Sequence, residues 1–309
     1  MDFTALRALT APGILRSSGA SRTEFKSWLA QGDYRIEEIE ASGDMRLHVT
    51  NSKSLVESLG YDHSRFACAA FESVRQILAD PDFPRATAWA AIRMYYAAFF
   101  AAHSLMRAFG ISCSQVDPEQ ASLVTSYATI YGIENRFGRG FYSAVWMSGD
   151  QSVTIKKLGE SHKDTWKEFS SWLRVAEDRV SELPILSSVK IEIIDFISSL
   201  RSGLGGSGSA AGNWLSTFRN NVNYRHSYDA WFPYRKSSVR FDQVSRYVDG
   251  WHRPDFSPNI AFLEVDERTR FFGLCAAMLY FLRGVAQDVI ENSDKSSIHN
   301  LQTARLIAF

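Results

Sequence analysis

Apolar side chains recur at steps of three and four residues along most of the chain from Asp62 onward. This spacing is the period of an α-helix that buries one face, and prolines and glycines mark where such segments stop. The stripe Ile92, Tyr96, Phe99 and His103 shows the pattern most clearly. The predicted helices span residues 62–79, 85–109, 163–182, 189–200 and 266–291, and a further helix carries Arg219.

Two shorter parts of the chain show a different pattern. Apolar and polar residues alternate in Tyr34–Ile39 and Arg46–Val49, and the turn residues Ala-Ser-Gly-Asp between them predict a β-hairpin. Turn residues at 138–140 and 147–150 predict a second hairpin. Because helical spacing dominates elsewhere, we expect an all-α core with minor β content, in which residues 1–60 form a small mixed α/β segment.

The composition indicates a folded protein without a strong overall charge. The 309 residues are 45% hydrophobic and 22% charged, and 34 basic residues balance 34 acidic ones. A whole-surface electrostatic attraction to nucleic acid is therefore excluded, and any such binding must be local. Residues 219–253 contain seven Lys or Arg against three Asp, with eight interleaved aromatic residues. This segment is equally well interpreted as a solvated basic loop or as a nucleic-acid surface.

The three cysteines, Cys68, Cys113 and Cys275, are widely separated and form no C-x-x-C pair. This spacing excludes a cysteine-rich zinc site and a disulfide framework, and it suits a reducing compartment. The first residues lack the apolar core of a signal peptide, and the most apolar stretch, Tyr95–Ala102, is too short to span a membrane. We therefore expect a soluble cytoplasmic protein that uses no cofactor, no metal and no membrane.

Most histidines carry no motif. His103 lies on the apolar stripe of its helix, and such a residue is more often a hydrogen-bonded core histidine than a ligand. His162, His252 and His299 lie far apart in the sequence and show no metal-ligand spacing. They indicate no site.

The run Gly203–Gly208 matches G-x-G-x-x-G, which raises the alternative of a nucleotide-binding regulator. A dinucleotide site requires a buried strand directly before the glycines, but residues 189–200 fit a helix better. No lysine follows the glycines, so a P-loop is not supported either. A connecting loop is the favoured interpretation of this run.

Arg219 and His226 are seven residues apart, which is close to two turns of an α-helix. If the helix continues through His226, both side chains lie side by side at the edge of the apolar arc that contains Phe218 and Val222. Arginine binds phosphate, and histidine moves protons near neutral pH. From this geometry alone, a catalytic pair and two rim residues beside the core are equally supported.

Two segments resemble a known family. Arg93-Met94-Tyr95-Tyr96-Ala97-Ala98-Phe99 resembles the Arg-x-Tyr-Tyr-Ala-x-Phe helix typical of HEPN domains, which are helical bundles of toxin, antiviral-defence and RNA-processing proteins. Arg219-Asn220 with His226 is similar to their catalytic signature, an Arg, often with a polar neighbour, and a His after four to six residues. The resemblance covers roughly residues 62–110 and 209–292. It implies a HEPN-like domain over residues 61–300 with an insertion at about 111–200.

The resemblance also implies an activity, which is metal-independent endoribonucleolytic cleavage by attack of the ribose 2′-hydroxyl. Arg219 would bind the phosphate, His226 would act as general base or acid, and Asn220 would position them. Single-stranded RNA is the expected substrate, and a homodimer the expected assembly. The expected RNA-contacting residues are Tyr224, Arg225, Arg235 and Lys236.

The toxin branch of the family implies a form of regulation. There a Tyr two positions after the His is adenylylated by a separate nucleotidyltransferase antitoxin, and Tyr228 occupies that position. We therefore expect a toxin or antiviral-defence effector. The alternative from a different class is a HEPN-like scaffold or interaction module without catalytic activity.

Overall fold

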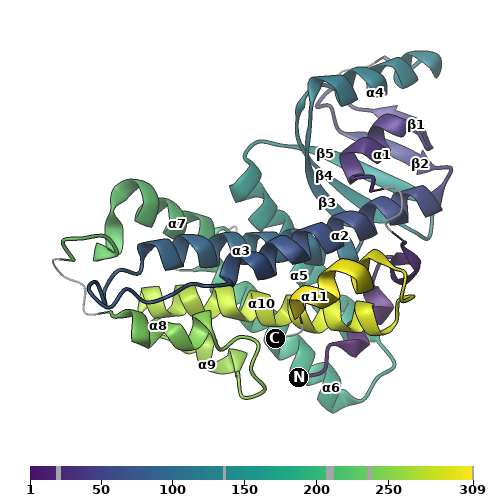
Figure 1. Ribbon diagram of the computed structural model, residues 1–309. Coiled ribbons are helices and arrows are strands. Elements are labelled where there is room, and N and C mark those ends of the chain that lie inside the picture. Colours follow the sequence, from purple (N-terminus) through teal and green to yellow (C-terminus); the bar gives the residue numbers. More distant parts are fainter. Residues whose placement is uncertain (19–21, 135–136, 207–211, 235–238, 308–309) are drawn as a thin grey trace.

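The computed structural model of the chain describes residues 1–18, 22–134, 137–206, 212–234 and 239–307. A five-stranded antiparallel sheet lies at one end of a bundle of long helices (Figure 1). The protein is therefore a mixed α/β protein with a helical majority, and the expectation of an all-α fold was wrong. The alternating segments that we treated as minor β content join into one continuous sheet.

The strand order is β1-β2-β5-β4-β3. Both predicted hairpins are confirmed, as β1–β2 and as β4–β5. The additional pairing of β2 with β5 aligns Leu47 with Val153 and so links the N-terminal hairpin to the later one. The strands are β1 (Tyr34–Ile39), β2 (Met45–Val49), β3 (Ile111–Val116), β4 (Gly140–Met147) and β5 (Ser152–Leu158).

The helices form the larger part of the molecule. Those predicted over residues 85–109, 163–182 and 266–291 are confirmed to within a few residues, as α3, α5 and α10. The helices are α1 (Phe25–Gln31), α2 (Ser52–Val74), α3 (Ala88–Ala108), α4 (Pro118–Ile130), α5 (Ser161–Glu182), α6 (Ser187–Gly205), α7 (Trp214–Arg225), α8 (Phe241–Val248), α9 (Pro258–Phe262), α10 (Glu267–Glu291) and α11 (Ala304–Ile307). Short 3₁₀ segments occur at Thr4–Leu9, Ile14–Arg16 and Ser227–Asp229, and a π-helix at His299–Thr303.

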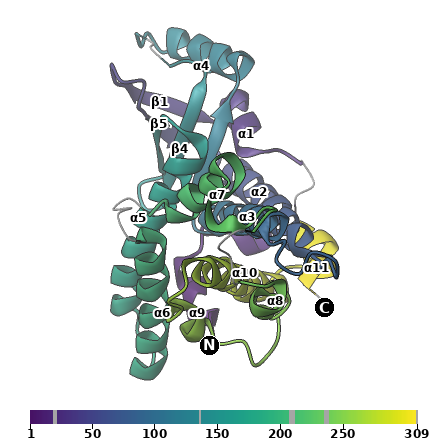
Figure 2. The same ribbon diagram turned by 90° about the vertical axis from the view of Figure 1, so that its left-hand side faces the viewer.

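Two apolar cores hold these elements together. The smaller core lies between the sheet and the helices α1 and α4, and it includes Trp28, Leu47 and Val124. The larger core fills the bundle around α3, which packs against α2, α5, α7 and α10 (Figures 1 and 2). Helix α10 is long and apolar enough to cross a membrane, but 72% of its most apolar 18-residue stretch is buried inside the protein.

Helix α2 starts ten residues earlier than its spacing predicts. The side chain of Asn51 accepts a hydrogen bond from the backbone N–H of Ser54 and thereby caps the helix. Asp62, which could have served as the cap, lies inside the helix and is 1% exposed. A carboxylate buried at that depth requires a charged partner, and the fold supplies two arginines.

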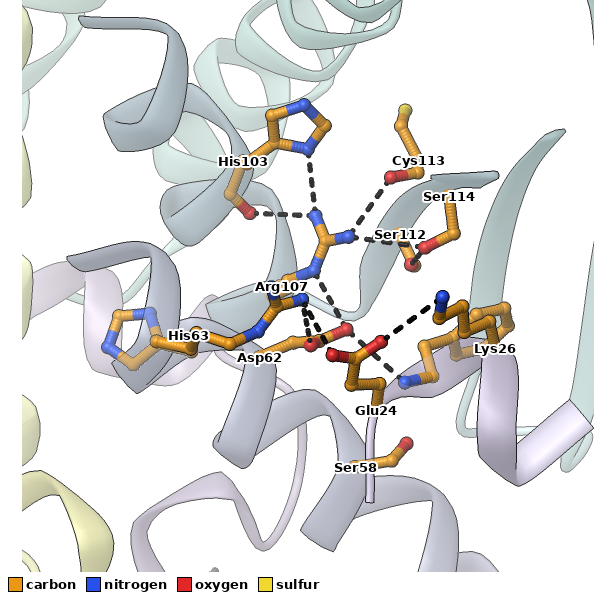
Figure 3. Close-up of polar contacts among 12 residues, drawn as sticks. Glu24, Lys26, Ser58, Asp62, His63, His103, Arg107, Ser112, Cys113 and Ser114 are labelled. Atoms are coloured by element: carbon orange, nitrogen blue, oxygen red, sulfur yellow. Dashed lines mark hydrogen bonds and ion pairs between the residues drawn. The ribbon is translucent and has the colours of Figure 1, made fainter. Parts of the chain in front are cut away.

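One is the partly exposed Arg65, which donates to Asp62 Oδ1 at 2.9 Å, and the other is Arg107 on α3, which is fully buried (Figure 3). Its Nε donates to Asp62 Oδ2 at 3.2 Å, and its remaining nitrogens donate to the carbonyls of His103 and Cys113 and to Ser114 Oγ. His103 Nδ1 accepts a further bond from Arg107 at 3.0 Å, which confirms His103 as a hydrogen-bonded core residue. This cluster ties α2 and α3 to strand β3.

The first three residues of the glycine run, Gly203–Gly205, belong to a helix and not to the predicted loop. Helix α6 continues through Gly205 and ends at Gly206, which has a φ of 51°. A Cβ at Gly203 would lie 2.4 Å from Leu274 Cδ2, so this glycine permits close packing against α10. The glycines therefore end a helix, and a helix C-terminus repels phosphate. Ser207 and Gly208 lie outside the described residues.

Candidate functional site

Arg219 is buried without an anionic partner. It lies on α7, is 7% exposed, and its guanidinium lies over the rings of Tyr95 and Tyr96 on α3, at 4.9 Å and 5.8 Å from their centroids. Its Nε is buried with no hydrogen-bond acceptor, and it forms no ion pair with any residue of the described ranges. Cation–π contacts offset only part of the cost of burying a charge. An anion at this position would supply the missing negative charge.

The two segments that resemble HEPN motifs meet at this point. Tyr95 and Tyr96 come from the Arg-x-Tyr-Tyr segment, and they contact the arginine of the second segment. Arg93 of the first segment has a structural role, because it donates to the carbonyl of Ser73 at 3.0 Å at the end of α2. The tyrosines, and not that arginine, contribute to the site.

The histidine that the fold brings beside Arg219 is His162, the second residue of α5. Its Nδ1 lies 2.9 Å from the hydroxyl of Tyr95, and its ring lies 4.4 Å from that of Phe99. Trp166 Nε1 donates to the same Tyr95 hydroxyl at 3.3 Å. His162, Tyr95 and Arg219 thus form one cluster built from α5, α3 and α7.

The electrostatics of this cluster keep its groups neutral apart from Arg219. Burial, followed by the charge of Arg219, lowers the pKa of His162 to about 4. Burial raises the pKa of Tyr95, although hydrogen bonds from Trp166 and Ser216 and the charge of Arg219 oppose the shift. At neutral pH the cluster therefore carries the single positive charge of the guanidinium.

His226 does not lie on the helix of Arg219. Helix α7 ends at Arg225, and His226 adopts a left-handed conformation with φ 50° and ψ 31°. A residue in that conformation turns the chain away from the helix axis, so a helical projection no longer places its side chain. The alignment predicted from a continuous helix was therefore wrong. His226 and Asn220 are both exposed.

The backbone after α7 is unusually strained. Four non-glycine residues between positions 226 and 234 have positive φ, namely His226, Tyr228, Asp229 and Tyr234. Such conformations cost energy and are found preferentially at functional sites, where the surrounding structure enforces them. Trp231 anchors the segment, because its Nε1 donates to the carbonyl of Val222 at 2.9 Å.

An exposed aromatic surface surrounds His226. Trp89 at the start of α3 packs perpendicular to Trp231 at 5.4 Å, and the Trp231 ring lies 6.1 Å from that of His226. Trp89 is 67% exposed, although helical spacing places it on a buried arc. Tyr224 and Phe232 are 71% and 72% exposed. Large exposed rings of this kind suit contact with a partner or with bases.

The structure describes only one of the three remaining residues that we expect to contact RNA. Arg225 is exposed at the end of α7, next to Tyr224. Arg235 and Lys236 lie outside the described residues.

Tyr228 is held by several contacts. Its ring stacks on Phe218 at 4.3 Å, and its hydroxyl donates to Glu267 Oε1 at 3.0 Å. Burial and the neighbouring carboxylate of Glu267 raise the pKa of Tyr228, against a hydrogen bond from Asn221. Modification of this hydroxyl would require the bond to Glu267 to open, because a phosphate beside a carboxylate is repelled.

His162 is the residue of this site that the sequence did not indicate. It precedes Arg219 by more than fifty positions and belongs to no motif. Within the described ranges, no group of three or more His, Cys, Asp or Glu side chains is arranged to hold a metal ion.

Comparisons with models of protein families, with curated proteins and with solved structures found no match.

Proposed function

We propose that this protein is an endoribonuclease that cleaves RNA by attack of the ribose 2′-hydroxyl on the adjacent phosphate. The observation that carries the proposal is the buried guanidinium of Arg219, which has no carboxylate partner among the described residues. A phosphodiester supplies the missing negative charge. The meeting of Arg219 with Tyr95 and Tyr96 supports the proposal, because it joins two segments that resemble one family's motifs.

Arg219 binds the scissile phosphate and stabilises the charge that develops in the transition state. His226, which follows the last residue of α7, moves the proton of the 2′-hydroxyl or that of the leaving 5′-oxygen. Asn220 orients the substrate from the exposed face of α7. The requirement for a 2′-hydroxyl makes the reaction selective for RNA over DNA. The products are a 2′,3′-cyclic phosphate and a 5′-hydroxyl.

Incubation with total RNA, followed by mapping of the new ends, tests the proposal. We expect the parent protein to produce 2′,3′-cyclic phosphate ends and His226→Ala to be at least about 100-fold slower, as is typical when a general acid or base is removed. His48→Ala, on the outer part of the sheet, is the matched control and should cleave like the parent. Absence of cleavage by the parent, or equal cleavage by His226→Ala, would contradict the assignment.

The aromatic surface beside His226 predicts how the RNA is held. Trp89→Ala should weaken binding of single-stranded RNA by roughly 1–3 kcal/mol, the contribution of one stacked base. Fluorescence anisotropy with a 2′-deoxy-substituted, uncleavable oligonucleotide measures the effect. Tyr131→Ala, an exposed aromatic at the end of α4, should leave the affinity unchanged. Equal losses in both variants would argue against a localised stacking surface.

A role as toxin or antiviral-defence effector follows from such an activity, because uncontrolled cleavage of RNA stops growth. The proposal includes a homodimer and a separate antitoxin as partners. The competing function is a scaffold or interaction module without catalytic activity. It predicts that the parent protein does not cleave RNA and that substitution of Arg219 leaves binding to its partners unchanged.

A further inference from the structure

We propose that His162 is a second substrate-contacting residue, which donates a hydrogen bond from Nε2 to the same phosphate that Arg219 binds. The inference rests on the proposed function and names a residue for it that no sequence motif indicates. The phosphate site is then formed by three helices: His162 comes from α5, Arg219 from α7, and Tyr95 and Tyr96 from α3.

The tautomer of His162 follows from its neighbours. Trp166 Nε1 can only donate, so the Tyr95 hydroxyl accepts from it at 3.3 Å. Ser216 and Arg219 also donate to this hydroxyl, so its own proton goes to His162 Nδ1, which lies at 2.9 Å. A neutral imidazole that accepts at Nδ1 carries its proton on Nε2. His162 therefore presents an N–H donor from the ring edge opposite Tyr95.

The surroundings hold His162 neutral. The charge of Arg219 on α7 opposes the protonation of His162. His103 on α3 is close enough to interact with it electrostatically, and its ring neighbours include Tyr95, Tyr96 and Phe99. His162 also lies in the first turn of α5, where the helix dipole disfavours a cation and favours an anion. A phosphate therefore meets one full positive charge, one neutral donor and a helix N-terminus.

A neutral donor and a general acid have different consequences for the reaction. As a donor, His162 binds a non-bridging oxygen of the phosphate and neither gives up nor takes a proton during the reaction. Its bond strengthens as negative charge grows on that oxygen in the transition state. The contribution of His162 is therefore constant across the neutral range, and the proton transfers fall to His226.

Two substitutions separate this role from a structural one. His162→Gln retains an N–H close to the position of Nε2 and should keep most of the cleavage rate and the shape of the pH profile. His162→Ala removes the donor and should weaken binding of an uncleavable 2′-deoxy oligonucleotide about 10- to 100-fold, as expected for a lost hydrogen bond to a charged group. His252→Ala, in a different part of the fold, is the control.

Nuclear magnetic resonance of ¹⁵N-labelled histidine tests the site without any catalysis. We expect the Nε2–H tautomer for His162 and a shift of its Nε2 signal on addition of inorganic phosphate, which Arg219→Met should abolish. The opposite tautomer, or no response to phosphate, would overturn the inference. If phosphate binds but the parent protein does not cleave RNA, the nuclease proposal fails and the anion site stands. If RNA is cleaved equally by His162→Ala, only the role of His162 fails.

Discussion

Arg219→Met should abolish RNA cleavage while leaving the protein about as stable as the parent. Loss of a group that stabilises charge in a transition state slows a reaction about 100- to 1,000-fold or more. Stability should change by less than about 1 kcal/mol, because the variant loses two cation–π contacts but no longer buries an unpaired charge. Cleavage of a fluorescent RNA and thermal unfolding, measured on the same preparation, give both quantities.

Arg219→Lys tests whether the positive charge alone is sufficient for cleavage. Lysine retains the charge but lacks the planar fork that stacks on Tyr95 and binds two phosphate oxygens at once. We expect it to recover little of the lost rate. A variant that cleaves RNA normally without Arg219 would remove the basis of the proposed function. A variant that unfolds would show that the arginine serves the core.

Arg107→Met should have the opposite profile, a large loss of stability. Arg107 and Asp62 are both fully buried and are joined at 3.2 Å (Figure 3). Without Arg107, Asp62 keeps its ion pair with the partly exposed Arg65 at 2.9 Å but loses its buried one. Breaking a buried pair in this way costs about 3–5 kcal/mol. Equilibrium unfolding in urea measures the change, and we expect a lower midpoint with cooperative unfolding.

The double variant Arg107→Met with Asp62→Leu is the control for this pair. It removes both buried charges together and should recover part of the lost stability, because Arg65, which also loses Asp62, is partly exposed and keeps its ion pair with Glu24. A single Arg107→Met variant that loses less than 1 kcal/mol would mean that water reaches the pair. We therefore expect different effects on stability from replacing the two buried arginines, because Arg107 has a carboxylate partner and Arg219 has none among the described residues.

Local patterns predicted several features correctly. The alternation in Tyr34–Ile39 predicted a strand, and the stripe through Ile92 and Phe99 predicted α3, because both signals depend on neighbours within a few residues. The position of His103 on that stripe predicted a core residue. The boundaries were less accurate, since the cap of α2 at Asn51 lies outside its apolar stripe.

The errors arose where distant segments decide the outcome. Nothing within β2 or β5 shows that the two strands pair, so the fold class was predicted as all-α. The helix of Arg219 ends at Arg225, where the chain turns, and Trp231 then packs against Trp89 from a distant part of the chain. The spacing of apolar residues along the helix does not indicate such a turn.

The sequence by itself determined the helices α3, α5 and α10 and the two hairpins, and it identified Arg219 as a candidate for phosphate chemistry. Only the tertiary structure decided the chemical state of that arginine, since burial and the absence of a carboxylate among the described residues are properties of the packing. It also decided that His162 lies in the same cluster. The physical reason is that the apolar spacing of a helix or strand depends on residues close together in the sequence. Desolvation and ion pairing depend instead on which distant side chains pack together in the core.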